Sequence, residues 1–416
     1  MRVNKWTVGL AAAGLVSLTP ALLAQTTNAP APAAAPTPIP ITGMTATTIS
    51  GYVDTSAVWN PGTGNANPAP FAFNAGKQDG FNLDAVDIKI AHAQDETGWS
   101  AGYVAELSYG QDAEAIDGGA YPIRQAYVAL HMPVGNGIDW QLGRWDNLLG
   151  YESSDSYKDP NFTRSYGYSA EPTEHTGLLG SYNFTSAINL QLGVADTVQT
   201  ESGGLFGNER TDPGGEYVES KKSVVSLLTF TAPDSWGGFK GSAFYAGFDI
   251  GQGGATTGFN GGGVGPVSPK NREELYLGAT VNTPITGLTF GASWDSIEHE
   301  DVGGFDSGYF QAIAGYGSYK LTDKLTFNGR AEWANGYALD SAALAYGGAY
   351  GMHDVFALTG TLQYDLWANV ISRLELRWDH ACNGQDAFGG TGVAGSDSVP
   401  TKKNDVMLAA NVIYKF

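Results

Sequence analysis

The chain has 416 residues, a formal net charge of −20 at pH 7 and a single cysteine. The acidic balance argues against nucleic acid as a partner, because phosphate binding needs a basic face. One cysteine excludes an intramolecular disulfide and a cysteine-rich metal site. No run of about 18 apolar residues follows residue 24, so a bundle of transmembrane helices is excluded and a closed β-barrel is the remaining way to span a bilayer.

Residues 1–24 are predicted to be a secretory signal peptide. Arg2 and Lys5 form a basic start, an apolar run covers 8–18, and Ala24 supplies a small residue at the cleavage position. Residues 25–46 consist largely of Ala, Pro and Thr, a composition typical of a flexible or polyproline-like spacer. We therefore expect export through the Sec pathway, with residues 47–416 folding as one unit in the bacterial outer membrane.

Apolar and polar residues alternate with a period of two along the rest of the chain. In 99–109 one parity reads Trp, Ala, Tyr, Ala, Leu, Tyr, whereas Ser, Gly, Glu and Ser stand on the other. In the last segment, Val406, Leu408, Ala410, Val412, Tyr414 and Phe416 share one face, opposite Asp405, Asn411 and Lys415. This pattern predicts β-strands with one apolar and one polar face.

Connection lengths distinguish a membrane barrel from a soluble sandwich. Short turns are predicted at 95–98, 133–137, 185–186, 233–238, 284–287, 322–323 and 366–369. Long polar or glycine-rich segments lie between them, at 60–80, 110–121, 145–174, 198–222, 249–271, 298–307, 335–353 and 381–403. This alternation predicts an all-β fold, a transmembrane antiparallel up-and-down barrel of about sixteen strands with long outer loops and short periplasmic turns.

Aromatic residues support this prediction. An amphipathic ring at a strand end can sit at the lipid headgroups, although aromatics are also common in strands generally. The aromatic residues near predicted strand ends are Trp99, Tyr109, Tyr182, Phe184, Phe239, Trp294, Tyr319, Trp333 and Trp378. The chain also ends on Phe416, which resembles the terminal strand by which bacterial outer-membrane proteins are recognised for assembly.

The segments 142–152, 161–168 and 171–177 resemble the OmpL-like type of outer-membrane β-barrel porins. In that family a strand ending in Gly plus a basic or polar residue, here Gly143-Arg144, leads into a long loop with a Gly-Tyr-Glu element, here 150–152. The loop returns through Pro-Thr-Glu-His-Thr-Gly at 172–177. The resemblance implies a porin-like barrel. The third loop lacks the Pro-Glu-Phe-Gly-Gly tip of the general trimeric porins. Whether this loop folds into the pore, and whether the protein is a monomer or a trimer, therefore both stay open.

Strand parity places a set of charged side chains in the lumen, since a charge facing lipid would cost about 2–4 kcal/mol. The candidates for a constriction are Arg144, Asp146, Glu152, Asp155, Arg330, Glu332, Arg373, Glu375, Arg377 and Asp379. Further lumen-facing charges are predicted at Asp54, Asp87, Lys89, Glu106, Lys240, Asp295 and Lys320. One hypothesis sets Arg330, Arg373 and Arg377 against Asp146, Glu152 and Asp155, giving a transverse field; the alternative is the ordinary polarity of a wet lumen.

An aromatic ladder for sugars is not evident on the lumen parity. Tyr127, Tyr276 and Tyr316 would join such a ladder only if the predicted register slipped by one residue.

These features predict a porin for passive diffusion of small hydrophilic solutes or ions, with outer-membrane lipid around it. Acidic residues of one outer loop (Glu201, Glu209, Asp212, Glu216 and Glu219) would favour cations weakly, unless they are ordinary solvated side chains. An enzyme is not expected, because none of the six histidines stands in a recognisable nucleophile motif. No cofactor, metal or catalytic residue is predicted. The alternative is a closed structural or surface-binding barrel that presents its outer loops to a partner.

Overall fold

The computed structural model describes residues 47–61, 69, 77, 79–112, 123–196, 222–252, 271–299, 308–336, 354–390 and 399–416. The expected signal peptide, the spacer and the acidic loop at 201–219 lie outside these residues. None of the helices in the described segments has the length and hydropathy that a transmembrane helix requires.

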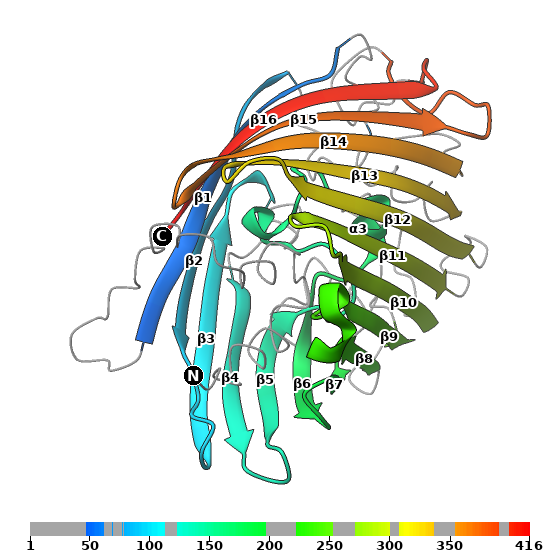
Figure 1. Cartoon of the computed structure of the whole chain (residues 1–416). Coiled ribbons are helices and arrows are strands. Elements are labelled where there is room, and N and C mark those ends of the chain that lie inside the picture. The colour runs from blue at the N-terminus through cyan, green and yellow to red at the C-terminus, as the bar shows by residue number, and fades with distance from the viewer. Residues whose placement is uncertain are drawn as a thin grey trace.

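Sixteen antiparallel strands form a closed barrel in which every strand pairs with its sequence neighbours (Figure 1). In chain order they are β1 (Thr47–Trp59), β2 (Gly80–His92), β3 (Ser100–Tyr109), β4 (Ile123–Met132), β5 (Ile138–Asp146), β6 (Glu174–Asn183), β7 (Ile188–Ala195), β8 (Ser223–Thr231), β9 (Ala243–Gln252), β10 (Asn271–Asn282), β11 (Leu288–His299), β12 (Gly308–Lys320), β13 (Leu325–Gly336), β14 (Asp354–Trp367), β15 (Val370–Ala381) and β16 (Asn404–Lys415). The predicted fold, strand number and alternation of short and long connections are confirmed.

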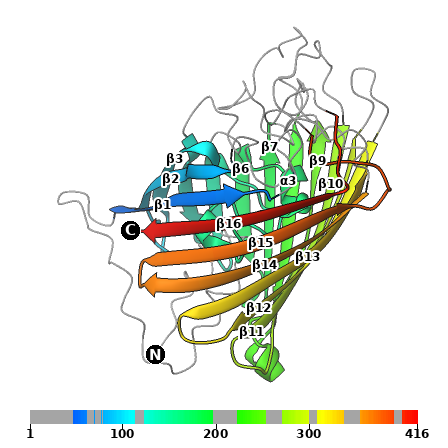
Figure 2. The ribbon, with the colours of Figure 1, turned by 90° about the horizontal axis from the view of Figure 1, so that it is seen from above.

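The barrel closes between its first and last strands, which run side by side in Figure 2. Tyr52 pairs with Lys415 and Val53 with Tyr414. The final residue extends the ladder, because the Phe416 and Gly51 amides each donate to the other's carbonyl oxygen at 3.0 Å. Closure removes the unpaired strand edges that would otherwise leave backbone polar groups unsatisfied in lipid.

Each strand presents an apolar face outward and a mixed face inward. On β16, Val412 and Tyr414 are exposed, as is Phe416 directly after the strand, whereas Asn411 and Ile413 are buried inside. On β15, Leu374 and Leu376 are exposed between the buried Arg373, Glu375 and Arg377. The outward face therefore suits a hydrocarbon environment, and the charged residues are enclosed by the barrel.

Of the predicted lumen lysines, Lys240 lies outside the strands, and Lys320 lies at the end of one. Lys240 ends the 3-10 helix η4 (Asp234–Phe239) in the turn between β8 and β9 and is exposed, so its assignment to a strand interior was wrong. Lys320 is the last residue of β12; its side chain is 48% exposed and its Nζ lies 3.9 Å from the Asp323 carboxylate. The alternation of inward and outward side chains does not show at which residue a strand ends.

Three tyrosines face the lumen although the predicted register placed them outside it. Tyr276 of β10 stands directly opposite Asp295 of β11, and Tyr127 and Tyr316 are buried on inward positions. They face inward in the register observed, without any slip.

Candidate functional site in the barrel lumen

The third outer connection, residues 147–173 between β5 and β6, folds into the barrel. We call it loop L3. It contains the 3-10 helix η3 (Ser156–Lys158) and the one-turn helix α3 (Tyr166–Ala170), which Ser165 caps by accepting a hydrogen bond from the Tyr168 amide at 3.2 Å. Leu148, Leu149 and Tyr166 are each no more than 4% exposed. A loop this buried needs partners for its backbone groups, and the barrel wall supplies them.

Three arginines on β13 and β15 donate to the backbone of L3. Arg330 donates to the Thr163 and Arg164 carbonyls at 2.7 and 3.0 Å. Arg373 reaches the Ser156 and Asp159 carbonyls at 2.9 and 2.6 Å, and Arg377 reaches the Arg164 carbonyl at 2.7 Å. A planar guanidinium with five donors can bind several carbonyls at once, which suits it to hold an irregular loop.

Carboxylates on the same wall accept from the amides of L3. Glu375 accepts from the Phe162 and Thr163 amides at 2.6 and 3.0 Å. Glu332 accepts from the Tyr166 amide at 2.7 Å. The Tyr166 hydroxyl donates to Asp379 at 2.9 Å. β13 and β15 thus supply partners for both donors and acceptors of this part of L3.

L3 also contacts the opposite wall through Asp155. This carboxylate pairs with Arg124 of β4 and with Lys158, whose Nζ lies 2.5 Å away. Burial alone would raise the pKa of Asp155, but Arg124 and Lys158 outweigh it and hold the pKa below the usual value. Arg124 binds Glu106 and Asp146 as well, each at 2.9 Å. L3 is therefore anchored on two sides of the lumen.

A third group of contacts is apolar and aromatic. Leu148 and Leu149 pack in one cluster with inward-facing Tyr127, Tyr245 and Tyr276. Tyr151 of L3 stacks on Tyr316 of β12 with ring centroids 4.1 Å apart. The Tyr151 ring lies over Gly291 of β11, where an added Cβ would come within 2.0 Å of the hydroxyl oxygen. These tyrosines pack against L3 and therefore do not form an open aromatic ladder for sugars.

The ten predicted constriction residues all lie in or beside this region, but their pairing differs from the transverse field. Among the predicted opposite pairs, Arg330 and Glu152 do meet, at 2.6 Å. Asp146 and Asp155 instead pair with Arg124, whose role the sequence reasoning missed. The charges of Arg330, Glu152 and Asp155 are buried in direct ion pairs. These pairs hold L3 against the barrel wall, and their charges do not face one another across water.

Arg144 serves the same region from β5. It donates to Glu174 at 3.2 Å and to the Arg124 carbonyl at 3.0 Å. Arg124 was missed because β4 has an irregular register opposite Glu106 and Leu107, so neighbouring Arg124 and Gln125 are both buried. Simple alternation assigns only one of two such neighbours to the lumen.

Asp87, Glu106 and Asp155 form the one group of carboxylates in the described segments whose geometry could suit a metal ion, with ligand atoms within 4.8 Å of one another. Lys89 lies 2.9 Å from Glu106, and Arg124 and Lys158 pair with Asp155. The cluster already has protein counter-ions, so its residues do not fit a metal site.

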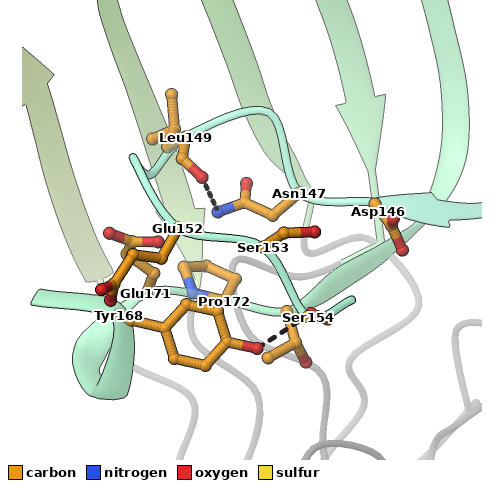
Figure 3. A pocket seen from close by; sticks show the side chains of 10 residues that line it. Asp146, Asn147, Leu149, Glu152, Ser153, Ser154, Tyr168, Glu171 and Pro172 are labelled. Carbon is orange, nitrogen blue, oxygen red and sulfur yellow. Dashed lines mark hydrogen bonds between the residues drawn. The ribbon is translucent and has the colours of Figure 1, made fainter. Parts of the chain in front are cut away.

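A small cleft lies between the end of β5 and the two ends of L3, near residues 147–154 and 168–173 (Figure 3). Asp146 stands on one side, and Glu152, Glu171 and Tyr168 stand on the other. The Tyr168 hydroxyl and Ser154 are hydrogen-bonded at 2.9 Å, and Asn147 donates to the Leu149 carbonyl at 3.1 Å. The lining of the cleft is polar and includes the carboxylates of Asp146, Glu152 and Glu171.

A closed barrel with an apolar exterior, a charged interior and an inward loop defines an outer-membrane channel of the porin class. The family model described as beta-barrel porin-2, OmpL-like, matches residues 46–416. The chain belongs to this family of bacterial outer-membrane porins, which identifies a channel rather than an enzyme.

Solved structures with this fold are similar at low sequence identity. An anion-selective porin from Comamonas acidovorans has a TM-score of 0.57 and 12% identity, over 89% of this chain and 99% of that one. The channel DcaP of Acinetobacter baumannii gives 0.55 and 13%, over 89% and 97%. OmpF of Salmonella typhi, in complex with daunomycin, gives 0.54 and 15%, also over 89% and 97%. Comparison with curated proteins gave no match.

Proposed function

We propose that this porin passes small hydrophilic solutes and ions by passive diffusion, with a preference for cations. The supporting observation is the charge enclosed by the barrel. Buried side chains of the described residues include sixteen aspartates and glutamates but eight lysines and arginines. A passage lined by excess negative charge raises the local concentration of cations and lowers that of anions.

Part of this excess lies on the inner face of β9 to β11, which carries Asp249, Glu274 and Asp295. We call these three residues the acidic wall. Asp249 stands directly opposite Glu274 in the ladder, and both are fully buried. Arg272 contacts Glu274 at 3.4 Å, and His175 lies 3.3 Å from Asp249. By contrast, Glu332 of β13 and Asp379 of β15 are paired with Arg330 and Arg377. We therefore assign the preference to the acidic wall.

L3 supports a narrow passage. An unobstructed barrel of sixteen strands leaves an aqueous channel. Here L3 contacts β4 through Asp155, β13 and β15 through the arginines, and β12 through Tyr151. We therefore expect a small conductance and a low size limit for solutes.

The experiment is the reversal potential of the purified, refolded protein in a planar bilayer under a potassium chloride gradient. The wild-type protein should show a potential of the sign that favours potassium. Neutralising the acidic wall with Asp249→Asn and Glu274→Gln should move the potential toward zero. Glu273→Gln is the matched control, because this neighbour of Glu274 is exposed on the outer face of β10 and should leave the potential unchanged. A wild-type potential favouring chloride would refute the preference.

The number of anchors on L3 favours one second candidate, a closed barrel that presents its outer loops to a partner. Such a protein would insert into membranes and remain folded without conducting. Single-channel recording separates the two functions, since a closed barrel gives no current steps.

A further inference from the structure

A β-bulge on β2 places the Asp84 side chain inside the barrel. On the facing strand β1, Asp54 pairs with Ala85 and Thr55 pairs with Leu83. Asp84 is therefore an extra residue with no partner on β1. Consecutive residues of a regular strand face opposite sides, yet Asp84 and Ala85 are both buried. Bulges redirect side chains in this way and are frequent beside functional sites.

The side chain of Lys77 binds Asp84 from the connection between β1 and β2. Its Nζ lies 2.7 Å from Asp84 Oδ1 and also pairs with Asp112, which follows β3. The same Nζ lies over the Phe162 ring of L3, 5.7 Å from the ring centroid. Lys77, Asp84 and Phe162 are 1%, 0% and 7% exposed. Two carboxylates and an aromatic ring are groups that bind an ammonium, through charge-assisted hydrogen bonds and a cation–π contact.

Asp84 and Phe162 are each held in place by partners other than Lys77. The Ser56 hydroxyl of β1 donates to Asp84 Oδ1 at 3.0 Å. The Phe162 amide donates to Glu375 of β15 at 2.6 Å. The barrel wall therefore positions both groups independently of the lysine, as a preorganised binding site requires.

The negative charge around the lysine exceeds its own positive charge. Asp54 and Asp112 both interact electrostatically with Asp84. Asp84 Oδ2 is buried and finds no hydrogen-bond donor among the described residues. The two arginines that interact with Asp54 and Asp112, Arg373 and Arg164, are engaged by Asp159 of L3. The three carboxylates therefore favour an ammonium here, whether or not it belongs to this chain.

We propose that Asp84, Asp112 and Phe162 form a binding site for a primary ammonium group, which Lys77 fills as a ligand tethered within the chain. An aliphatic primary amine from solution can take its place. An ammonium has three N–H donors, so it reaches both carboxylates at once. The inference deepens the proposed function by naming a class of cation that the lumen binds, and it rests on that function only in requiring that small cations enter the lumen.

The test begins with Lys77→Ala, which removes the tethered ammonium. The variant leaves room for propylammonium, which has the atoms of the lysine side chain beyond Cβ. Propylammonium chloride should raise the thermal unfolding midpoint of the folded variant in detergent by a few degrees, in a saturable manner. Tetramethylammonium carries the same charge without an N–H donor, so at equal ionic strength it should not raise the midpoint.

Matched variants identify the groups that bind the amine. The wild-type protein should respond less at every concentration, because Lys77 competes for the site. Lys77→Met fills the space without a charge and should not respond. The double variant Lys77→Ala with Asp84→Asn lacks the buried carboxylate and should not respond either. Lys240→Ala removes an exposed lysine in a turn and should behave as wild type.

Three results would overturn the inference. The first is an equal rise with propylammonium and tetramethylammonium, and the second is a response that survives Asp84→Asn. If Lys77→Ala does not fold alone, its refolding yield becomes the readout, and propylammonium should restore the yield where tetramethylammonium does not. A yield that propylammonium does not restore is the third contrary result. All these measurements are made without a current, so failure of the ammonium site is distinguished from failure of the barrel to conduct.

Discussion

Replacement of Arg330 by alanine tests whether L3 is held by the wall. The Arg330 guanidinium binds Glu152 at 2.6 Å and also donates to the Thr163 and Arg164 carbonyls. Its removal therefore takes several charge-assisted hydrogen bonds away from L3. Removing one partner of a buried ion pair costs about 3–5 kcal/mol, because the other charge remains buried without compensation. At about 1.4 kcal/mol per factor of ten, the ratio of docked to released L3 should fall by roughly two to three and a half orders of magnitude.

The assay for Arg330→Ala is single-channel recording, in which the variant should show larger and noisier current steps than the wild type. Arg330→Lys keeps the charge but loses the fork of donors, so it should fall between the two. Lys240→Ala removes an exposed basic residue in a turn and serves as the control. Wild-type steps from a folded Arg330→Ala protein would refute the role of the arginine in holding L3.

The remaining predictions concern the other anchors of L3. Asp155→Asn leaves Arg124 with less charge compensation and should raise conductance; unchanged steps would show that β4 does not restrain the loop. Arg124 and Lys158 lower the pKa of Asp155, so the ion pair between Asp155 and Arg124 should persist as the pH falls to the ordinary carboxyl pKa of about 3.9. The pair should break only at lower pH, and conductance measured at falling pH checks this. Gly291→Val should displace Tyr151 by steric clash and widen the pore, whereas a tightly closed variant would contradict the stacking role of that ring.

The architecture could be predicted from the sequence because each signal was local. Alternation over a strand such as β16 needs only neighbouring residues, and the lengths of connections can be read along the chain. The same parity predicts an inward position for Arg373, Glu375, Arg377 and Asp379, and all four are buried in the structure. A charge facing lipid is costly enough to make this inference robust.

The partners of these side chains could not be predicted, because they depend on the path of L3 across the lumen. The sequence indicated a long loop but not that Asp155 would reach Arg124 while Thr163 reached Arg330. The irregular register beside Arg124 and the position of Lys240 in a turn also depend on local backbone geometry that periodicity does not encode. The predicted opposition of charges therefore became a set of direct contacts.

Whether the barrel conducts is decided by single-channel recording of the purified, refolded protein in a planar bilayer. We expect stable current steps that are small for a barrel of sixteen strands, because L3 narrows the lumen. A folded, membrane-inserted protein that gives no steps over many insertions would contradict it and would identify the chain as a closed barrel.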